Sequence, residues 1–78
     1  MLIIFSQHAL VKLEQRKIIR RFVLETVKNP ELIRPSYSLR DELYKKFGKY
    51  YLKVVVKRYN NRIIVLTMHW VAKTKKKL

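Results

Sequence analysis

The chain has 78 residues, enough for one domain but near the lower limit for a core that folds without disulfides or metal. It contains no cysteine, which excludes a disulfide framework and a thiolate metal site and predicts a cytoplasmic location. Nineteen Lys and Arg residues against five acidic residues give a formal net charge of +14. Because so strong a positive field attracts polyanions, we expect a nucleic acid or an acidic protein as the partner.

The chain opens with a pattern that predicts a strand followed by a helix. Residues 2–5 are apolar and suit a short strand. The run is too short for a signal peptide or a membrane span, so we expect no membrane association. Ser6 is a typical N-cap residue, and residues 7–16 that follow it have the apolar stripe of an amphipathic helix.

A second helical pattern covers residues 18–27. It ends at Asn29, because Pro30 disfavours the α conformation in the residue before it. Whether Lys17 separates two helices or bends a single one stays open. Residues 30–38 predict a loop.

Residues 39–47 predict a strand that turns at Gly48 into the next strand. A tight turn there would place Tyr44 beside Lys53 and Lys46 beside Tyr51. Leu43 and Phe47 would then lie on one side of the strand, and Glu42, Tyr44 and Lys46 on the other.

Residues 49–71 predict a β-hairpin whose register decides which side chains share a face. A two-residue loop at Asn60-Asn61 would pair Lys57 with Ile64 and mix charged with apolar groups on both faces. A loop of the bulged kind would shift the register by one residue. It would give the pairs Lys57–Val65, Val55–Thr67 and Lys53–His69, and one wholly apolar face of Leu52, Val54, Val56, Ile64, Leu66, Met68 and Trp70. We prefer this second register, because a sheet covered by helices on one side requires one apolar face.

The predicted fold class is α+β: a short N-terminal strand and two helices packed on one face of a three- to four-stranded antiparallel sheet. Residues 1–72 form the single domain, and residues 73–78 form a basic C-terminal tail. The helix-free face would collect basic, phenolic and imidazole side chains: Tyr44, Lys46, Tyr51, Lys53, Lys57, Thr67 and His69.

Several short motifs follow one another in a set order: Ser6-x-His8-Ala9, then Arg16, Asn29-Pro30-Glu31, Leu52-x-Val54-Val55-Val56 and Ile64-Val65-Leu66-Thr67. From Phe5 to about Trp70 the chain thereby resembles a small uncharacterised domain family allied to the RelE/ParE toxins, whose architecture several ribonucleases share. The resemblance implies a curved sheet with helices behind it and a front that faces nucleic acid. It also implies toxin-like ribonuclease activity that an acidic antitoxin holds off.

Metal-independent RNA cleavage by the 2′-hydroxyl needs a base, an acid for the leaving oxygen and positive charge near the phosphorane. His69, Tyr44 and Lys53 are the candidates for these roles, with Glu42 as an alternative base. The candidate nucleic-acid contacts are Lys46, Tyr51, Lys57, Thr67 and Arg16. With two histidines and no cysteine we expect neither a structural zinc site nor a cofactor.

Each candidate also has a purely structural alternative. His69 would then be a partly buried histidine at a strand end, and the lysines would form a solvated strand face. Arg16 would bind carbonyl groups at the end of its own helix or pair with Glu14 or Glu42. For His8, in the first helical turn, a structural role is the preferred interpretation.

The leading interpretation is a RelE/ParE-like toxin domain that binds RNA, either free RNA or ribosome-bound messenger RNA, and cleaves it without a metal. The first alternative is a nucleic-acid-binding module without catalysis on the same basic face. The second is an inhibitor of a topoisomerase, as in the ParE proteins.

Overall fold

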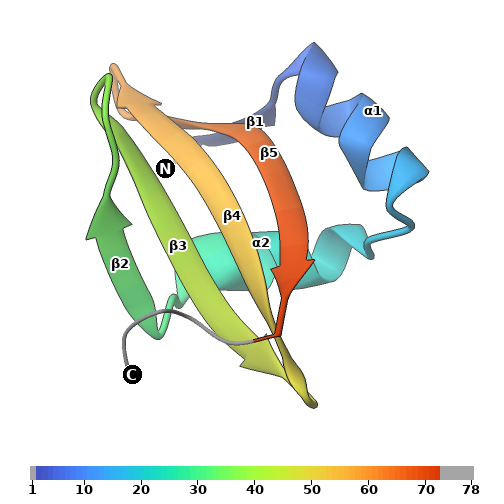
Figure 1. Cartoon of the computed structure of the whole chain (residues 1–78). Helices are drawn as coiled ribbons and strands as arrows, with labels where there is room; N and C mark the ends of the chain where they lie inside the picture. The colour runs from blue at the N-terminus through green and yellow to red at the C-terminus, as the bar shows by residue number, and fades with distance from the viewer. Residues whose placement is uncertain (1, 73–78) are drawn as a thin grey trace.

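The computed structural model describes residues 2–72 and shows two helices and one five-stranded sheet (Figure 1). The elements in chain order are β1 (Leu2–Phe5), α1 (Gln7–Gln15), α2 (Arg20–Lys28), β2 (Leu32–Pro35), β3 (Arg40–Phe47), β4 (Tyr50–Tyr59) and β5 (Arg62–Val71). The α+β class is as predicted. The predicted tail at residues 73–78 lies outside the described residues.

The sheet has the order β1-β5-β4-β3-β2 and differs from the prediction in two ways. It is mixed, because β1 runs parallel to β5, with Phe5 opposite Val65. It also has an additional strand, since Leu32–Pro35 lies within the predicted loop but pairs with β3 as β2. β2 is short and ends in a proline, which an edge strand tolerates because its outer N–H groups need no partner.

The helices begin and end near the predicted residues. Ser6 caps α1, since its hydroxyl accepts a hydrogen bond of 3.0 Å from the Ala9 N–H. Lys17 has a left-handed φ of 52°, which ends α1 and shows that there are two separate helices. α2 starts at Arg20, two residues later than predicted, and ends at Asn29 before Pro30.

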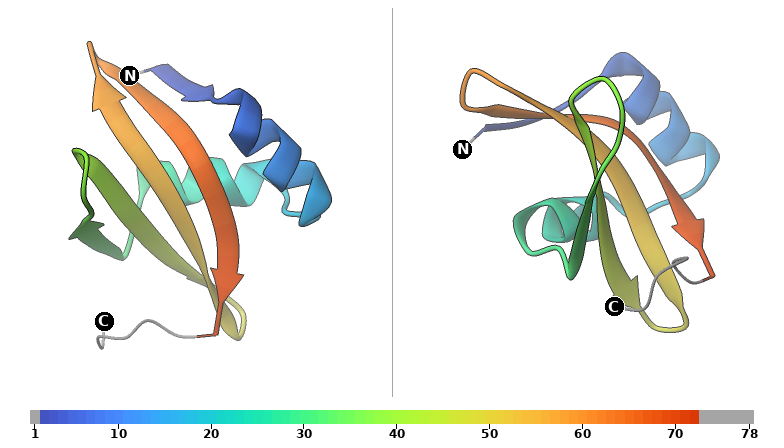
Figure 2. Two further views of the ribbon diagram at one scale, coloured as in Figure 1. Left: turned by 45° about the horizontal axis from the view of Figure 1, so that its top comes forward. Right: turned by 60° about the vertical axis from the view of Figure 1, so that its left-hand side comes forward.

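α2 crosses behind β3 and β4, whereas α1 lies along β5 (Figure 2). Both helices contribute side chains to one core, and the opposite face of β3 and β4 carries no helix (Figure 1). Within residues 2–72, neither helix is long and apolar enough to cross a membrane.

The β4–β5 hairpin combines the two registers that the sequence left as alternatives. Asn60 and Asn61 both have left-handed φ values, 48° and 60°, and form a two-residue turn in which Lys57 pairs with Ile64. The preferred pair Lys57–Val65 is therefore wrong. Further along, a β-bulge leaves Leu66 as an extra residue in β5, because Val56 pairs with Val65 but Val55 pairs with Thr67.

Beyond the bulge the register is the predicted one, and Lys53 lies opposite His69. Before the bulge, the core receives Ile63 and Val65, and not Ile64 and Leu66 as predicted. The residues that form the core are Ala9, Ile18, Val23, Val27, Leu43, Leu52, Val54, Val56, Ile63, Val65 and Met68. Trp70 closes the other end of this face, where its ring meets Phe22 and Phe47 edge-on at 6.3 and 6.1 Å.

Candidate nucleic-acid interface

The side of the sheet opposite α2, which we call the front face, is built from alternate residues of β3, β4 and β5, and α1 lies along its β5 border. The pairs Tyr44–Lys53 and Lys53–His69 form its central row, so the three candidate catalytic side chains lie next to one another across three strands. All of the residues predicted for this face lie on it: Tyr44, Lys46, Tyr51, Lys53, Lys57, Thr67 and His69.

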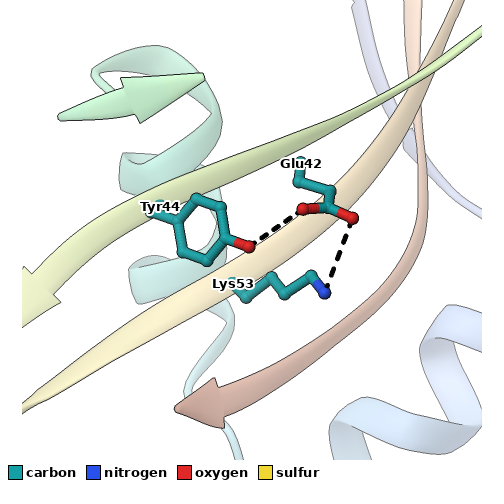
Figure 3. Close-up of polar contacts among 3 residues, drawn as sticks. All are labelled: Glu42, Tyr44 and Lys53. Carbon is teal, nitrogen blue, oxygen red and sulfur yellow. Dashed lines mark hydrogen bonds and ion pairs between the residues drawn. The ribbon is translucent and has the colours of Figure 1, made fainter. Parts of the chain in front are cut away.

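The Glu42 carboxylate contacts two side chains at the centre of the front face (Figure 3). One oxygen of Glu42 accepts a hydrogen bond of 2.9 Å from the Tyr44 hydroxyl, and the other lies 3.6 Å from Lys53 Nζ. Only about a fifth of the Lys53 and Glu42 side chains is exposed. Glu42 therefore fixes the positions of the Tyr44 and Lys53 side chains, and both of its oxygens already have partners.

His69 is half-buried at the β5 end of the central row. Burial lowers the pKa of its imidazole below the ordinary value of 6.5, and the charges of Lys53 and Arg16 lower it further, while Glu42 acts in the opposite direction. This lowered pKa favours the neutral imidazole at pH 7. A neutral imidazole can accept a proton, which is the requirement for a general base.

Tyr44 has the opposite character. Burial raises the pKa of its phenol above 10.0, and the hydrogen bond to Glu42 and the Glu42 charge raise it further, while Arg34 acts in the opposite direction. The phenol thus keeps its proton at neutral pH. The phenol is held in place by its hydrogen bond, but its raised pKa makes it a weak proton donor.

Arg34 was missed in the sequence because it lies in β2, within the segment predicted to be a loop. In the structure it lies opposite Glu42 across β2 and β3. The sequence Leu-Ile-Arg-Pro of β2 has no apolar–polar alternation that would have indicated a strand, although burial alternates along it in the structure.

Arg16 binds β5 and not its own helix. Its Nη1 donates a hydrogen bond of 2.6 Å to the Met68 carbonyl oxygen and lies 3.4 Å from Thr67 Oγ1. The predicted contacts with carbonyls of α1, Glu14 or Glu42 are thus replaced by a link between the end of α1 and the β5 edge. This link also brings the Arg16 charge close to His69.

Cationic side chains continue along the front face on both sides of the central row. Lys46, opposite Tyr51, lies one same-face position toward the Gly48 turn, or about 7 Å from the centre. Lys57 lies two same-face positions away in the other direction, or about 13 Å. The row of basic groups therefore extends over roughly 20 Å, long enough to follow several phosphates of an extended strand.

Among residues 2–72, no three or more His, Cys, Asp and Glu side chains form a group that could hold a metal ion. The chemistry available at the front face is that of an imidazole, two phenols, a carboxylate and several cationic side chains.

Comparison with protein families gives one match, which covers residues 5–70 and is described as Domain of unknown function (DUF4258). The chain belongs to this family. The match includes every element from α1 to β4 and nearly all of β5, so every candidate site residue named above lies inside the matched region. Neither curated proteins nor solved structures give a match.

Proposed function

We propose that this DUF4258 domain is a toxin-like, RNA-binding protein that cleaves RNA at the front face without a metal. The observation that carries the proposal is a half-buried imidazole, its pKa lowered by burial, directly opposite a lysine on the basic face of the sheet. The likeness to RelE/ParE toxins noted in the sequence supports the same reading. An acidic antitoxin is the protein partner that fits the net charge of +14.

The proposed reaction uses the side chains of the central row together with Arg16. His69 takes the proton of a ribose 2′-hydroxyl, and the 2′-oxygen attacks the adjacent phosphorus. Lys53 and Arg16 stabilise the charge that develops on the non-bridging oxygens. The 5′-oxygen leaves with the proton of the Tyr44 phenol, and the products are a 2′,3′-cyclic phosphate and a 5′-hydroxyl end.

A second candidate function, RNA binding without cleavage, is favoured by the contacts of Glu42. Tyr44 donates a hydrogen bond to Glu42 and has a raised pKa, so it acts as an acid only after this hydrogen bond breaks. Lys53 is a single point charge without the bidentate fork of an arginine, which also weakens its grip on a phosphorane. Inhibition of a topoisomerase stays an alternative that no feature of the front face favours.

The deciding experiment incubates the purified chain with free RNA and with ribosome-bound messenger RNA in the presence of a chelator. We expect cleavage products with 2′,3′-cyclic phosphate ends, because the attacking oxygen belongs to the substrate. Binding without any cleavage would replace the ribonuclease by the binding module. If the chain neither binds nor cleaves RNA, the ribonuclease and the RNA-binding module are both excluded.

A further inference from the structure

A second feature of the front face lies beside the catalytic candidates. It is a hollow of about 400 Å³ between the start of α1 and the sheet, which we call the α1 hollow. The residues that line it are Ser6, His8, Arg40, Val55, Leu66 and Thr67. The Ser6 N–H donates a hydrogen bond of 2.9 Å to the Val65 carbonyl, so the first turn of α1 is fixed against β5 where the hollow forms.

The floor of the α1 hollow is a product of the β-bulge. Leu66 is the extra residue of β5, and its side chain lines the hollow together with Val55, while Ile63 and Val65 remain in the core. A bulge commonly redirects a side chain in this way. The result is an apolar surface, partly shielded from water, in the middle of a basic face.

The rim of the α1 hollow supplies the polar groups. The hydroxyls of Ser6 and Thr67 are already engaged, the first by the Ala9 N–H and the second by Arg16. The side chains of His8 and Arg40 are exposed and have no hydrogen-bond or ion-pair partner within residues 2–72. Two planar groups with free N–H donors therefore border an apolar floor.

We infer that the α1 hollow binds a purine base, with guanine preferred, of an RNA strand whose phosphate lies at Lys53 and His69. A flat heterocycle suits an apolar floor, and the guanidinium of Arg40 matches the N7 and O6 acceptors of guanine in a bidentate pair. The inference rests on the proposed function for the position of the phosphate.

The spacing along the sheet fits one nucleotide. The Val55–Thr67 pair, which borders the α1 hollow, is the next same-face row after Lys53–His69, about 7 Å along the strands. A base splayed out from the scissile position would thus reach the hollow while its phosphate stays at the central row. Thr67 belongs to the hollow and also contacts Arg16, so it connects the two sites.

The test measures the affinity of short oligouridylates that contain one guanine, adenine or cytosine, or none. We expect the guanine oligomer to bind about tenfold or more tightly than the others. Arg40→Lys keeps the charge but removes the fork, so it should abolish this preference. Lys46→Ala removes a cation outside the hollow and should weaken all four oligomers by the same factor.

Equal affinity of the wild-type chain for all four oligomers would overturn the inference, and so would a preference that survives in Arg40→Lys. Thermal unfolding of each variant checks that the fold is intact. Guanosine 5′-monophosphate tests the hollow separately from RNA cleavage. Shifts of the Val55, Leu66 and Thr67 amide resonances on its addition support the hollow even if no RNA is bound or cleaved, and their absence counts against it.

Discussion

The Lys53 ammonium lies 3.6 Å from the Glu42 carboxylate in the middle of the front face. Glu42 is one of only five acidic residues in the chain, and on the proposed function a phosphate would bind where its carboxylate lies beside Lys53. A phosphate that binds there must compete with this carboxylate for the ammonium group, and it is repelled by the carboxylate charge.

Glu42→Gln should therefore strengthen RNA binding. The amide keeps the shape of the side chain but removes its charge, so Lys53 is freed for phosphate and the repulsion ends. We expect a several-fold gain in affinity at low salt, measured by fluorescence anisotropy. Asp41→Asn is the matched control, because Asp41 pairs with Arg58 on the opposite face of the sheet. Unchanged or weaker binding by Glu42→Gln would show that Glu42 does not compete with phosphate.

His69→Ala should separate catalysis from binding. If the imidazole is the general base, the variant should cleave RNA about 10²-fold more slowly or less, with nearly unchanged affinity. Lys53→Ala should reduce both cleavage and affinity, because a phosphate contact stabilises ground state and transition state alike. Single-turnover cleavage and equilibrium binding measure the two effects. Equal cleavage by wild type and His69→Ala would remove His69 from the mechanism.

The pH dependence follows from the lowered pKa of His69. The folded chain binds this proton less readily than the unfolded chain, so stability from the neutral imidazole is present above pH 6.5 and lost as pH falls below it. Cleavage should also decline only below pH 6.5. Nuclear magnetic resonance titration should place the His69 midpoint below 6.5, higher in Lys53→Met and lower in Glu42→Gln. His8→Gln assigns the two histidine signals.

RNA affinity should depend strongly on salt. If the row of cations on the front face neutralises about 6 phosphates, affinity should fall by roughly three decades between low and moderately high salt. Lys57→Ala should lower the number of neutralised phosphates by about one, so the affinity should fall less steeply with salt. A flat response to salt would instead indicate an acidic protein as the partner of the basic face.

Leu39 offers a test of the backbone in the β2–β3 connection. It has a left-handed φ of 58° and its side chain is 87% exposed, so it contributes strain without burial. Leu39→Gly should be more stable than Leu39→Val by about 1 kcal/mol, because a β-branched side chain makes this conformation worse. Chemical denaturation measures both variants. Tyr37→Ala, equally exposed but not left-handed, should leave stability nearly unchanged.

Local signals in the sequence were sufficient for most elements. Ser6 marked the start of α1, Pro30 the end of α2, and Gly48 the turn that pairs Tyr44 with Lys53. In each case the signal acts within a few residues, through a cap, a forbidden conformation or a left-handed turn position, so no knowledge of the rest of the chain is needed.

The pairing of β1 and the existence of β2 could be established only from the tertiary structure. The partner of β1 is β5, about 60 residues away, and nothing within Leu2–Phe5 indicates whether that pairing is parallel or antiparallel. β2 has four residues, too few for a clear alternation, and becomes a strand only because β3 offers a free edge. Arg34 reached the site through this pairing, which is why the sequence did not reveal it.

The sequence by itself determined that alternate residues of the last hairpin would divide into an apolar and a basic set, because side chains of a strand alternate between its two faces. Only the tertiary structure decided at which residue of β5 the alternation between the two faces shifts. The Asn60-Asn61 turn favours one register and the core requires another further on, and the extra residue Leu66 reconciles them. The same bulge places His69 beside Lys53 and opens the α1 hollow, since packing against the helices selects the register that buries Met68.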